Sequence, residues 1–257
     1  MKKIYWGTTM CELGPPKLIE PTLTNLKKDL NSDNYYFDKT EPIKLDGWLT
    51  CPAATGILNN IYVFRAGIEI KIKFNPDETL TIQFPSAKNK LKSSGGNEQI
   101  YSQIAEQIRR RTVVIRNKKT KFVTLDMNGY FFSEDDIFVE QHHPWLENTD
   151  VSRNTSSVIG GFYINKWFRP IQPTFIMHNN ELHIKPGDAL YYVKFPANEK
   201  YELIEFTVNK KILDHASFGT AFKFLKAHSP MNFLYNLFIG KKLNKTLLKE
   251  IKKNIIE

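Results

Sequence analysis

Two histidines and a glutamate near residue 180 have the types and spacing of a metal site. They are His178, Glu181 and His183, with Asn179 and Asn180 between the first two. Asparagine tolerates positive φ, so this pair predicts a two-residue hairpin loop that sets His178 opposite Glu181. His183 then shares their face, because side chains alternate along a strand. Two imidazoles and one carboxylate are typical of non-haem iron sites, which predicts binding of Fe(II) or another divalent metal.

The same two strands also support a plainer interpretation. Their intervening positions are apolar and predict the core side: Phe175, Met177, Leu182 and Ile184. The opposite face of an antiparallel pair is often exposed to solvent, so the histidines and the glutamate are alternatively ordinary surface residues.

Adjacent histidines form a second, weaker metal hypothesis. His142 and His143 precede Pro144 in a segment, residues 133–150, that holds six acidic residues and no lysine or arginine. Neighbouring residues of a regular strand point to opposite faces, so one metal takes both imidazoles only where the chain is irregular. Pro144 favours such irregularity, and a surface loop is the alternative.

Positive charge is concentrated between residues 101 and 125, which hold seven Arg or Lys and one Glu. Basic side chains bind phosphates and exposed aromatic rings stack on unpaired bases, so this segment predicts single-stranded nucleic-acid binding. The alternative is a solvated helix end and hairpin tip, with the nearby rings in the core. The basic candidates are Arg109, Arg110, Arg111, Arg116, Lys118 and Lys119, and the candidate rings are Phe122, Tyr130, Phe131 and Phe132.

Several familiar catalytic patterns are missing from the 257 residues. The sequence has no GxSxG, no GxxxxGK[ST], no HExxH and no CxxC. It has only two cysteines, Cys11 and Cys51, which excludes a disulfide framework and favours a cytoplasmic setting. Cys51 is expected to be a small buried residue. No apolar run approaches the ~20 residues of a membrane span, and no signal-peptide core follows Met1.

The elements that must position these residues are mostly strands. Apolar residues alternate over 68–74 and 79–84, which predicts a hairpin, and residues 98–111 have a helical apolar period. A second hairpin is predicted from 112–116 and 121–125, and Asn128-Gly129 has the composition of a turn. Further strands are expected at 162–168, 174–178, 182–185, 190–195 and 203–208. Many short strands predict a mainly β fold, an antiparallel β-sandwich or a jelly-roll-like barrel with a C-terminal helical tail.

The chain is expected to divide near residue 225. Residues 1–225 form the β-sandwich domain with an irregular, proline-containing N-terminal segment, and residues 226–257 form a basic helical tail that packs on it. In this tail Leu247, Leu248, Ile251 and Ile255 make one apolar stripe. Between the strands at 182–185 and 190–195, Lys185-Pro186-Gly187-Asp188 predicts a type II turn.

Three stretches carry a resemblance to a known group. They are residues 48–53 with 62–68, residues 184–190, and the terminal amphipathic helix. Together they resemble uncharacterised proteins of marine T4-like phages, which are distantly similar to a bacterial domain family of unknown function. The resemblance implies a phage origin and a β-sandwich, and it implies no catalytic residue.

These observations lead to three functional hypotheses. The first is a phage-type accessory or structural protein, without catalysis, that binds a protein partner or assembles with itself through a β-sandwich surface. The alternative is a cupin-like metal-dependent enzyme of the non-haem iron type that uses the two-histidine, one-carboxylate set. The third is single-stranded nucleic-acid binding through the basic segment. For a phage protein the expected compartment is the cytoplasm of a bacterial host.

Overall fold

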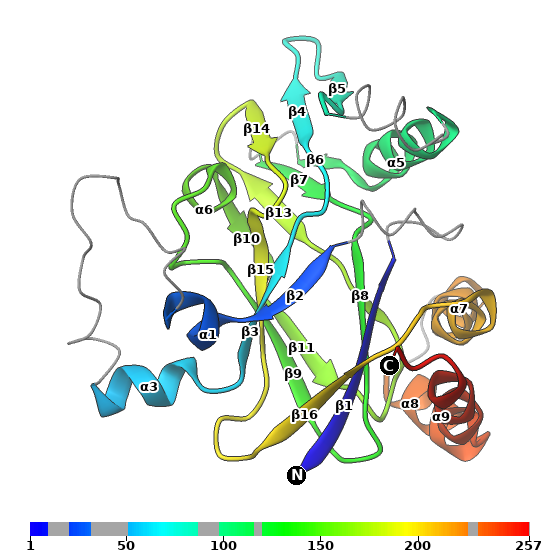
Figure 1. The fold of residues 1–257 in the computed structure, drawn as a ribbon. Helices are drawn as coiled ribbons and strands as arrows, with labels where there is room; N and C mark the ends of the chain where they lie inside the picture. The colour runs from blue at the N-terminus through cyan, green and yellow to red at the C-terminus, as the bar shows by residue number, and fades with distance from the viewer. Residues whose placement is uncertain (10–20, 32–50, 87–97, 116–119, 226–230, 257) are drawn as a thin grey trace.

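The computed structural model describes residues 1–9, 21–31, 51–86, 98–115, 120–225 and 231–256. The described chain is mainly β, as the sequence predicts, and its sheets are largely antiparallel. Figure 1 shows the strands at the centre and helices around them. None of the described helices is long and apolar enough to cross a membrane.

Sheets A and B have the longest strands and form the centre of the molecule. Sheet A has the order β12 (Pro170–Ile171), β8 (Asn128–Phe132), β1 (Lys2–Thr9) and β16 (Tyr201–Glu205), and β1 pairs with β16 in parallel. Sheet B has the order β11 (Gly160–Tyr163), β9 (Phe138–His142), β15 (Ala189–Lys194), β3 (Ile61–Arg65) and β2 (Thr22–Asn25). Each order ends in open edges, so neither sheet closes on itself in the described part of the chain.

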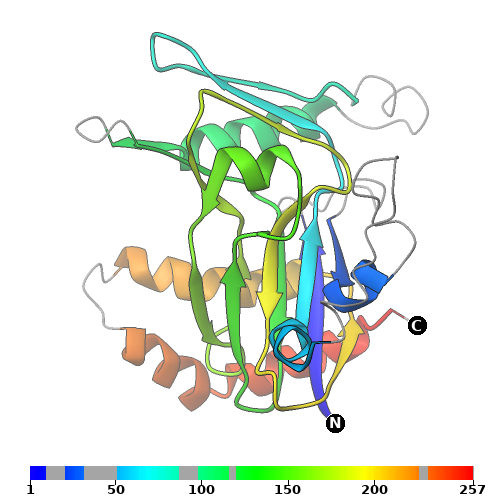
Figure 2. The ribbon, with the colours of Figure 1, turned by 90° about the vertical axis from the view of Figure 1, so that its left-hand side faces the viewer.

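Two smaller sheets continue beyond them. Sheet C has the order β14 (Glu181–Ile184), β4 (Ile70–Phe74) and β5 (Leu80–Gln83). Sheet D has the order β10 (Thr155–Ser157), β13 (Thr174–Met177), β7 (Thr120–Thr124) and β6 (Val113–Ile115). Figures 1 and 2 both show sheet C and α5 (Glu98–Arg111) together at one end of the molecule.

Alternation along the strands distributes side chains between separate cores. In β8, Phe131 belongs to the largest core together with Phe64 of β3, whereas Tyr130 and Phe132 point to the other face. That other face packs on the helices α7 (Lys210–Leu225), α8 (Met231–Gly240) and α9 (Leu243–Lys253). In sheet B, Val63 and Tyr192 point away from the largest core toward α1 (Leu26–Asn31) and α3 (Pro52–Leu58).

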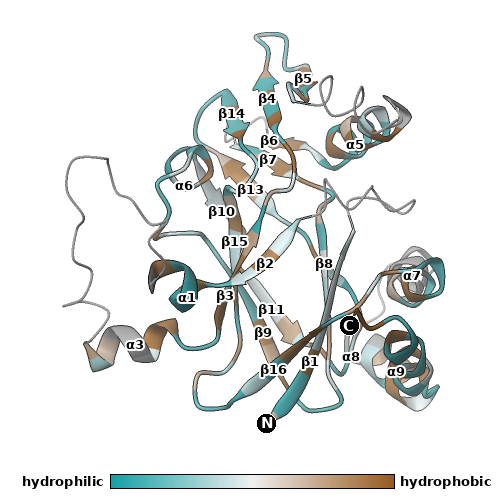
Figure 3. Ribbon diagram, in the orientation of Figure 1, coloured by the Kyte–Doolittle hydropathy of each residue, from teal (hydrophilic) through white to brown (hydrophobic). Residues whose placement is uncertain are grey.

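The C-terminal helices begin at Lys210, well before residue 226, and cover one face of sheet A (Figures 1 and 2). In α9, Leu247 and Ile251 are fully buried against that face, while the lysines of the helix lie outside. Figure 3 accordingly shows both brown and teal residues on α9. Apolar burial of this kind, rather than helix propensity, holds a short helix in place.

Several local predictions are confirmed. β4 and β5 pair as an antiparallel hairpin, α5 spans Glu98–Arg111, and β6 pairs with β7. At the predicted turn Gly187 has φ +88°, and Asp188 N–H donates to the Lys185 carbonyl at 3.1 Å. This turn connects β14 of sheet C to β15 of sheet B, so it joins two sheets rather than the strands of one hairpin.

Two local predictions are wrong. Asn128 and Gly129 open β8 instead of forming a turn. A Cβ on Gly129 would lie 2.9 Å from the Tyr191 hydroxyl and 3.0 Å from the Phe64 ring, so close packing explains the glycine. Cys51 is exposed rather than buried, and it is the N-cap residue of α3.

Candidate functional site

The hairpin predicted around residue 180 is wrong. β13 pairs with β10 and β7, whereas β14 pairs with β4, so the two strands belong to different sheets. In the register of β14, Leu182 lies opposite Ile72 and Ile184 lies opposite Ile70. Burial of these apolar pairs favours the long-range pairing over a local hairpin. Residues 178–180 therefore connect sheets D and C.

The three predicted metal ligands contact different partners. His178 Nε2 lies 2.9 Å from Ser156 Oγ, Glu181 Oε1 accepts from Lys73 Nζ at 2.5 Å, and His183 Nε2 lies 2.8 Å from Glu69 Oε1. Within the described residues, no group of three or more His, Cys, Asp or Glu side chains is arranged to hold a metal ion. The structure does not bring the predicted set together.

His142 and His143 also contact different partners. His142 Nε2 lies 3.1 Å from Glu140 Oε2. The backbone N–H of Ser157 donates to His143 Nδ1 at 3.2 Å, so Nδ1 is the acceptor and the ring proton is on Nε2, 3.1 Å from the Ser152 carbonyl. Both ring nitrogens of His143 thus connect the segment after β9 to α6 (Asp150–Asn154) and β10.

The basic candidates are paired where they are described. Arg110 Nε donates to Glu106 at 2.9 Å, Arg109 lies 3.8 Å from the same carboxylate, and Arg111 contacts buried Asp126 at 3.0 Å. Arg116, Lys118 and Lys119 lie outside the described residues. The rings of Tyr130, Phe131 and Phe132 are at most 3% exposed, so they do not face a nucleic acid.

A polar cleft of about 600 Å³ lies between sheet C and α6 and is lined in part by Glu181 and His183. Most of its charged groups have protein partners. Glu181 pairs with Lys73, and Asp150 accepts from the His183 backbone N–H at 2.7 Å, whereas the exposed side chain of Lys71 has no partner among the described residues. A cleft whose donors and acceptors are largely matched to each other offers a ligand little beyond surface contact.

A second pocket, of about 450 Å³, has a different character. It is lined by Gln141 and by side chains from residues 158–162 and 167–174. These residues lead from the end of β10 into β11, then through a turn to β12 and the start of β13. β11 and β12 are the outermost described strands of sheets B and A, so the pocket lies where the edges of two sheets meet. Its size is in the ordinary range of ligand pockets.

Arg169 is the one charged side chain among the described residues that line this pocket. Its guanidinium carbon lies 4.7 Å from the centre of the Phe162 ring and 5.4 Å from that of Trp167. No described carboxylate lies within 4 Å of it, and its buried Nε has no hydrogen-bond acceptor there. Burial lowers the pKa of Arg169, because a guanidinium loses solvation in this apolar place.

Trp167 supplies a second unsatisfied donor. Its side chain is 7% exposed and its buried Nε1–H has no described acceptor. The indole packs edge-on against Tyr235 of α8, with ring centres 5.7 Å apart, so helix α8 supports it from behind. Two buried donors without acceptors, one of them cationic, are rare in a folded protein and suit an acceptor ligand with negative charge.

The pocket has an apolar side that is partly exposed, and Gln141, Gln172 and Thr174 add polar groups to its lining. Val158 is 38% and Ile159 is 68% exposed, and Ile171 lies beneath them at 5%. β12 is held from below, because the fully buried Tyr191 donates its hydroxyl to the Ile171 carbonyl at 3.2 Å. Gly160 completes the rim, and a Cβ added there would meet no atom within 4 Å.

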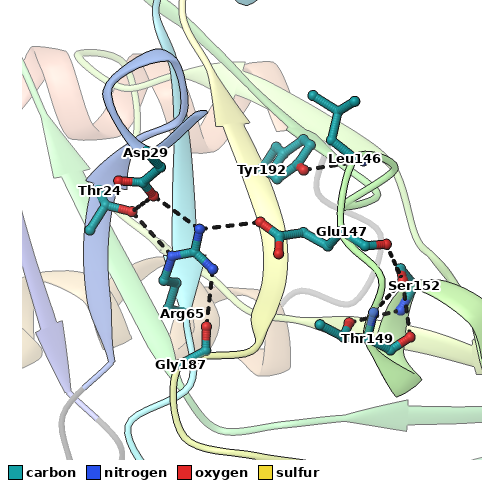
Figure 4. A network of polar contacts seen from close by, with 9 residues as sticks. All are labelled: Thr24, Asp29, Arg65, Leu146, Glu147, Thr149, Ser152, Gly187 and Tyr192. Atoms are coloured by element: carbon teal, nitrogen blue, oxygen red, sulfur yellow. Dashed lines mark hydrogen bonds and ion pairs between the residues drawn. The ribbon is translucent and has the colours of Figure 1, made fainter. Parts of the chain in front are cut away.

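Arg65 shows how a buried arginine is satisfied elsewhere in this chain. Figure 4 shows its guanidinium between two carboxylates: Nη2 lies 2.9 Å from Asp29 and 3.2 Å from Glu147, while Nη1 donates to the Gly187 carbonyl at 3.0 Å. Arg65 thereby connects α1, the loop after β9 and the turn before β15. Among the described residues, Arg169 has no such set of partners.

Sequence reasoning did not identify Arg169 or Trp167. Trp167-Phe168-Arg169-Pro170 contains a lone arginine between aromatic residues and a proline, and this is the one local signal. Comparison with known proteins adds no further guidance: no protein-family model, curated protein or solved structure matches the chain.

Proposed function

We propose that this chain is a binding protein whose pocket beside Arg169 takes the carboxylate of a partner molecule together with an apolar group next to it. The observation that carries the proposal is the partly buried guanidinium of Arg169, whose buried Nε has no described acceptor and which lies beside apolar side chains of the pocket. A charge in such a place is costly unless it is paired, so a protein that keeps it gains from the pairing on binding.

The charge of the pocket favours a monoanion. Arg169 contributes a single positive charge, and no lysine, histidine or second arginine is among the described lining residues. A carboxylate balances this charge one to one and matches the planar guanidinium, which lies close to the rings of Phe162 and Trp167 and has no described acceptor at Nε. A phosphate dianion would leave one charge unpaired near apolar side chains.

The proposal retains partner binding through a β surface, the first hypothesis from the sequence. We infer that sheets A and B form a sandwich-like pair, because the largest core takes side chains from both, such as Ile4 and Phe131 from one and Phe64 and Val139 from the other. The phage resemblance stays a prediction.

Titration with small carboxylates tests the proposal. The full chain, labelled with ¹⁵N, has four indole N–H signals, and Trp167→Phe identifies the one of interest. Hexanoate is expected to shift that signal saturably, whereas hexanamide, which has the same tail without the charge, is expected to leave it unchanged.

Two variants test separately whether binding requires the charge of Arg169 and the open volume of the pocket. Arg169→Gln removes the cation, and Gly160→Phe adds a ring to the pocket lining at a position where an added Cβ meets no atom within 4 Å. Both are expected to abolish the hexanoate shift. An absent shift in the unmodified chain, or an unchanged shift in Arg169→Gln, contradicts carboxylate capture at this pocket.

A further inference from the structure

β11 is an edge strand whose own residues lack the usual protection, although Lys166 lies over the Tyr163 ring at the strand's C-terminal end. It is the last strand of sheet B in the described chain, and its sequence Gly160-Gly161-Phe162-Tyr163 contains no charge and no proline. Natural proteins normally guard such edges with lysine, proline or a bulge, because an open edge pairs readily with another strand.

The pairing of β11 with β9 shows which backbone groups face outward. Phe162 lies opposite Val139, and Ile164 N–H donates to the Ile137 carbonyl at 3.0 Å. In an antiparallel pair hydrogen-bonding residues alternate, so the intervening Gly161 and Tyr163 direct their N–H groups to the open edge. These two donors are spaced as an added strand requires.

Internal packing explains only one of the two glycines of β11. A Cβ on Gly161 would lie 2.7 Å from the Phe138 ring and 2.8 Å from the Val139 carbonyl, so internal packing excludes a side chain there. At Gly160 nothing lies within 4 Å, so internal packing makes no such demand. The open space at Gly160 leads from the edge of β11 to the pocket beside Arg169.

Exposed apolar side chains flank the same edge. Val158, Ile159 and Tyr163 are 38%, 68% and 40% exposed, and all three belong to the segment that enters or forms β11. Such a run of apolar surface next to an open strand edge is typical of a site for another chain.

We propose, on the basis of the carboxylate capture argued above, that the ligand is the extended C-terminal segment of a partner protein, which adds to β11 as an antiparallel strand. Its terminal carboxylate pairs with Arg169 and its last side chain, an aliphatic or aromatic one, fills the pocket. Residues 158–160, which lead into β11, line the pocket together with Phe162, whereas Gly161 and Tyr163 do not, so the segment ends near Gly160 and extends back toward Tyr163.

The probe is a hexapeptide of alternating threonine and valine that ends in leucine. It is used with a free C-terminus, as the C-terminal amide, and with alternate backbone nitrogens methylated to remove strand donors. The free acid is expected to bind the full chain at least ~10-fold more tightly than hexanoate, because edge hydrogen bonds add to the ion pair. Hydrogen exchange of the Gly161 and Tyr163 amides is expected to slow in the complex.

The controls distinguish the two proposals. The methylated free acid is expected to bind no better than hexanoate. The C-terminal amide is expected not to bind the unmodified chain, and the free acid is expected not to bind the Gly160→Phe variant. If the free acid matches hexanoate and leaves both amides unprotected, strand addition is overturned while carboxylate capture stands. If the amide binds as tightly as the acid, capture of a C-terminus by Arg169 is overturned, whatever happens at the edge.

Discussion

The guanidinium of Arg169 lies over the ring of Phe162, 4.7 Å from its centre, with no described carboxylate beside it. The aromatic ring offsets part of the cost of burying the charge, since its face carries partial negative charge. It leaves the buried Nε without an acceptor in the described part of the chain. In the same chain, Arg65 lies between two carboxylates. The two arginines therefore differ in their pairing because of their surroundings and not because of the residue type.

Arg169→Met is expected to leave the free energy of unfolding unchanged or to raise it by up to ~1 kcal/mol. The substitution removes a buried, unpaired charge and keeps a similar apolar volume, which is commonly neutral or stabilising. Urea denaturation of the full chain measures this. A loss of more than ~1 kcal/mol would mean that the cation stabilises the fold and needs no ligand to explain it.

Arg65→Met is expected to have the opposite effect, lowering the free energy of unfolding by about 3 kcal/mol. The side chains of Arg65 and Glu147 are 17% and 10% exposed, so removal of the cation leaves two carboxylates close together with poor solvation. The same urea experiment reports it, with Lys73→Met at an exposed pair as the matched control. Equal effects of Arg65→Met and the control would contradict a structural role for the network in Figure 4.

Asp188→Asn is expected to raise stability at neutral pH. Burial raises the pKa of Asp188, and the Lys185 backbone N–H offsets this only in part. The folded state therefore holds the proton more tightly than the unfolded state, whose pKa is about 3.9. Stability falls as pH rises from that value through the folded pKa, and the penalty is complete above it.

Thermal unfolding across pH checks this prediction. Asparagine keeps an oxygen acceptor for Lys185, so the variant is expected to melt higher than the unmodified chain at about pH 7 and to match it at about pH 3. A variant that melts lower than the unmodified chain at every pH would show that the ionised carboxylate stabilises the turn.

Metal content is expected not to depend on His178. Its imidazole lies by Ser156, while Glu181 pairs with Lys73 in another sheet, so the set lacks the convergence a divalent ion requires. Samples equilibrated with Fe(II), Mn(II) or Zn(II) and then dialysed are expected to retain equal amounts in the unmodified chain and in His178→Ala. A loss of one equivalent in the variant would restore the metal hypothesis.

Sequence patterns were informative where short-range physics decides. Alternation over 70–83 fits a hairpin because the paired strands are neighbours in the chain, and the helical period of residues 98–111 depends only on local geometry. Glycine at 187 follows from the positive φ that its turn requires. The mainly β composition of the fold followed from the same signals.

The candidate sites depended on pairings between distant segments. His178 and Glu181 are three positions apart, but β13 and β14 gain more by pairing with β7 and β4, which places them in different sheets. The pocket likewise forms only because β11 and β12 end two sheets that meet there.

By itself the sequence determined many of the strands, helices and turns, since those choices rest on φ, ψ and the spacing of apolar side chains. Only the tertiary structure decided which polar groups found partners. Arg65 and Arg169 are the same residue type on strands or beside them, and only the fold supplies carboxylates to one and aromatic rings to the other. Solvation and pairing of a charge are set by neighbours from distant parts of the chain.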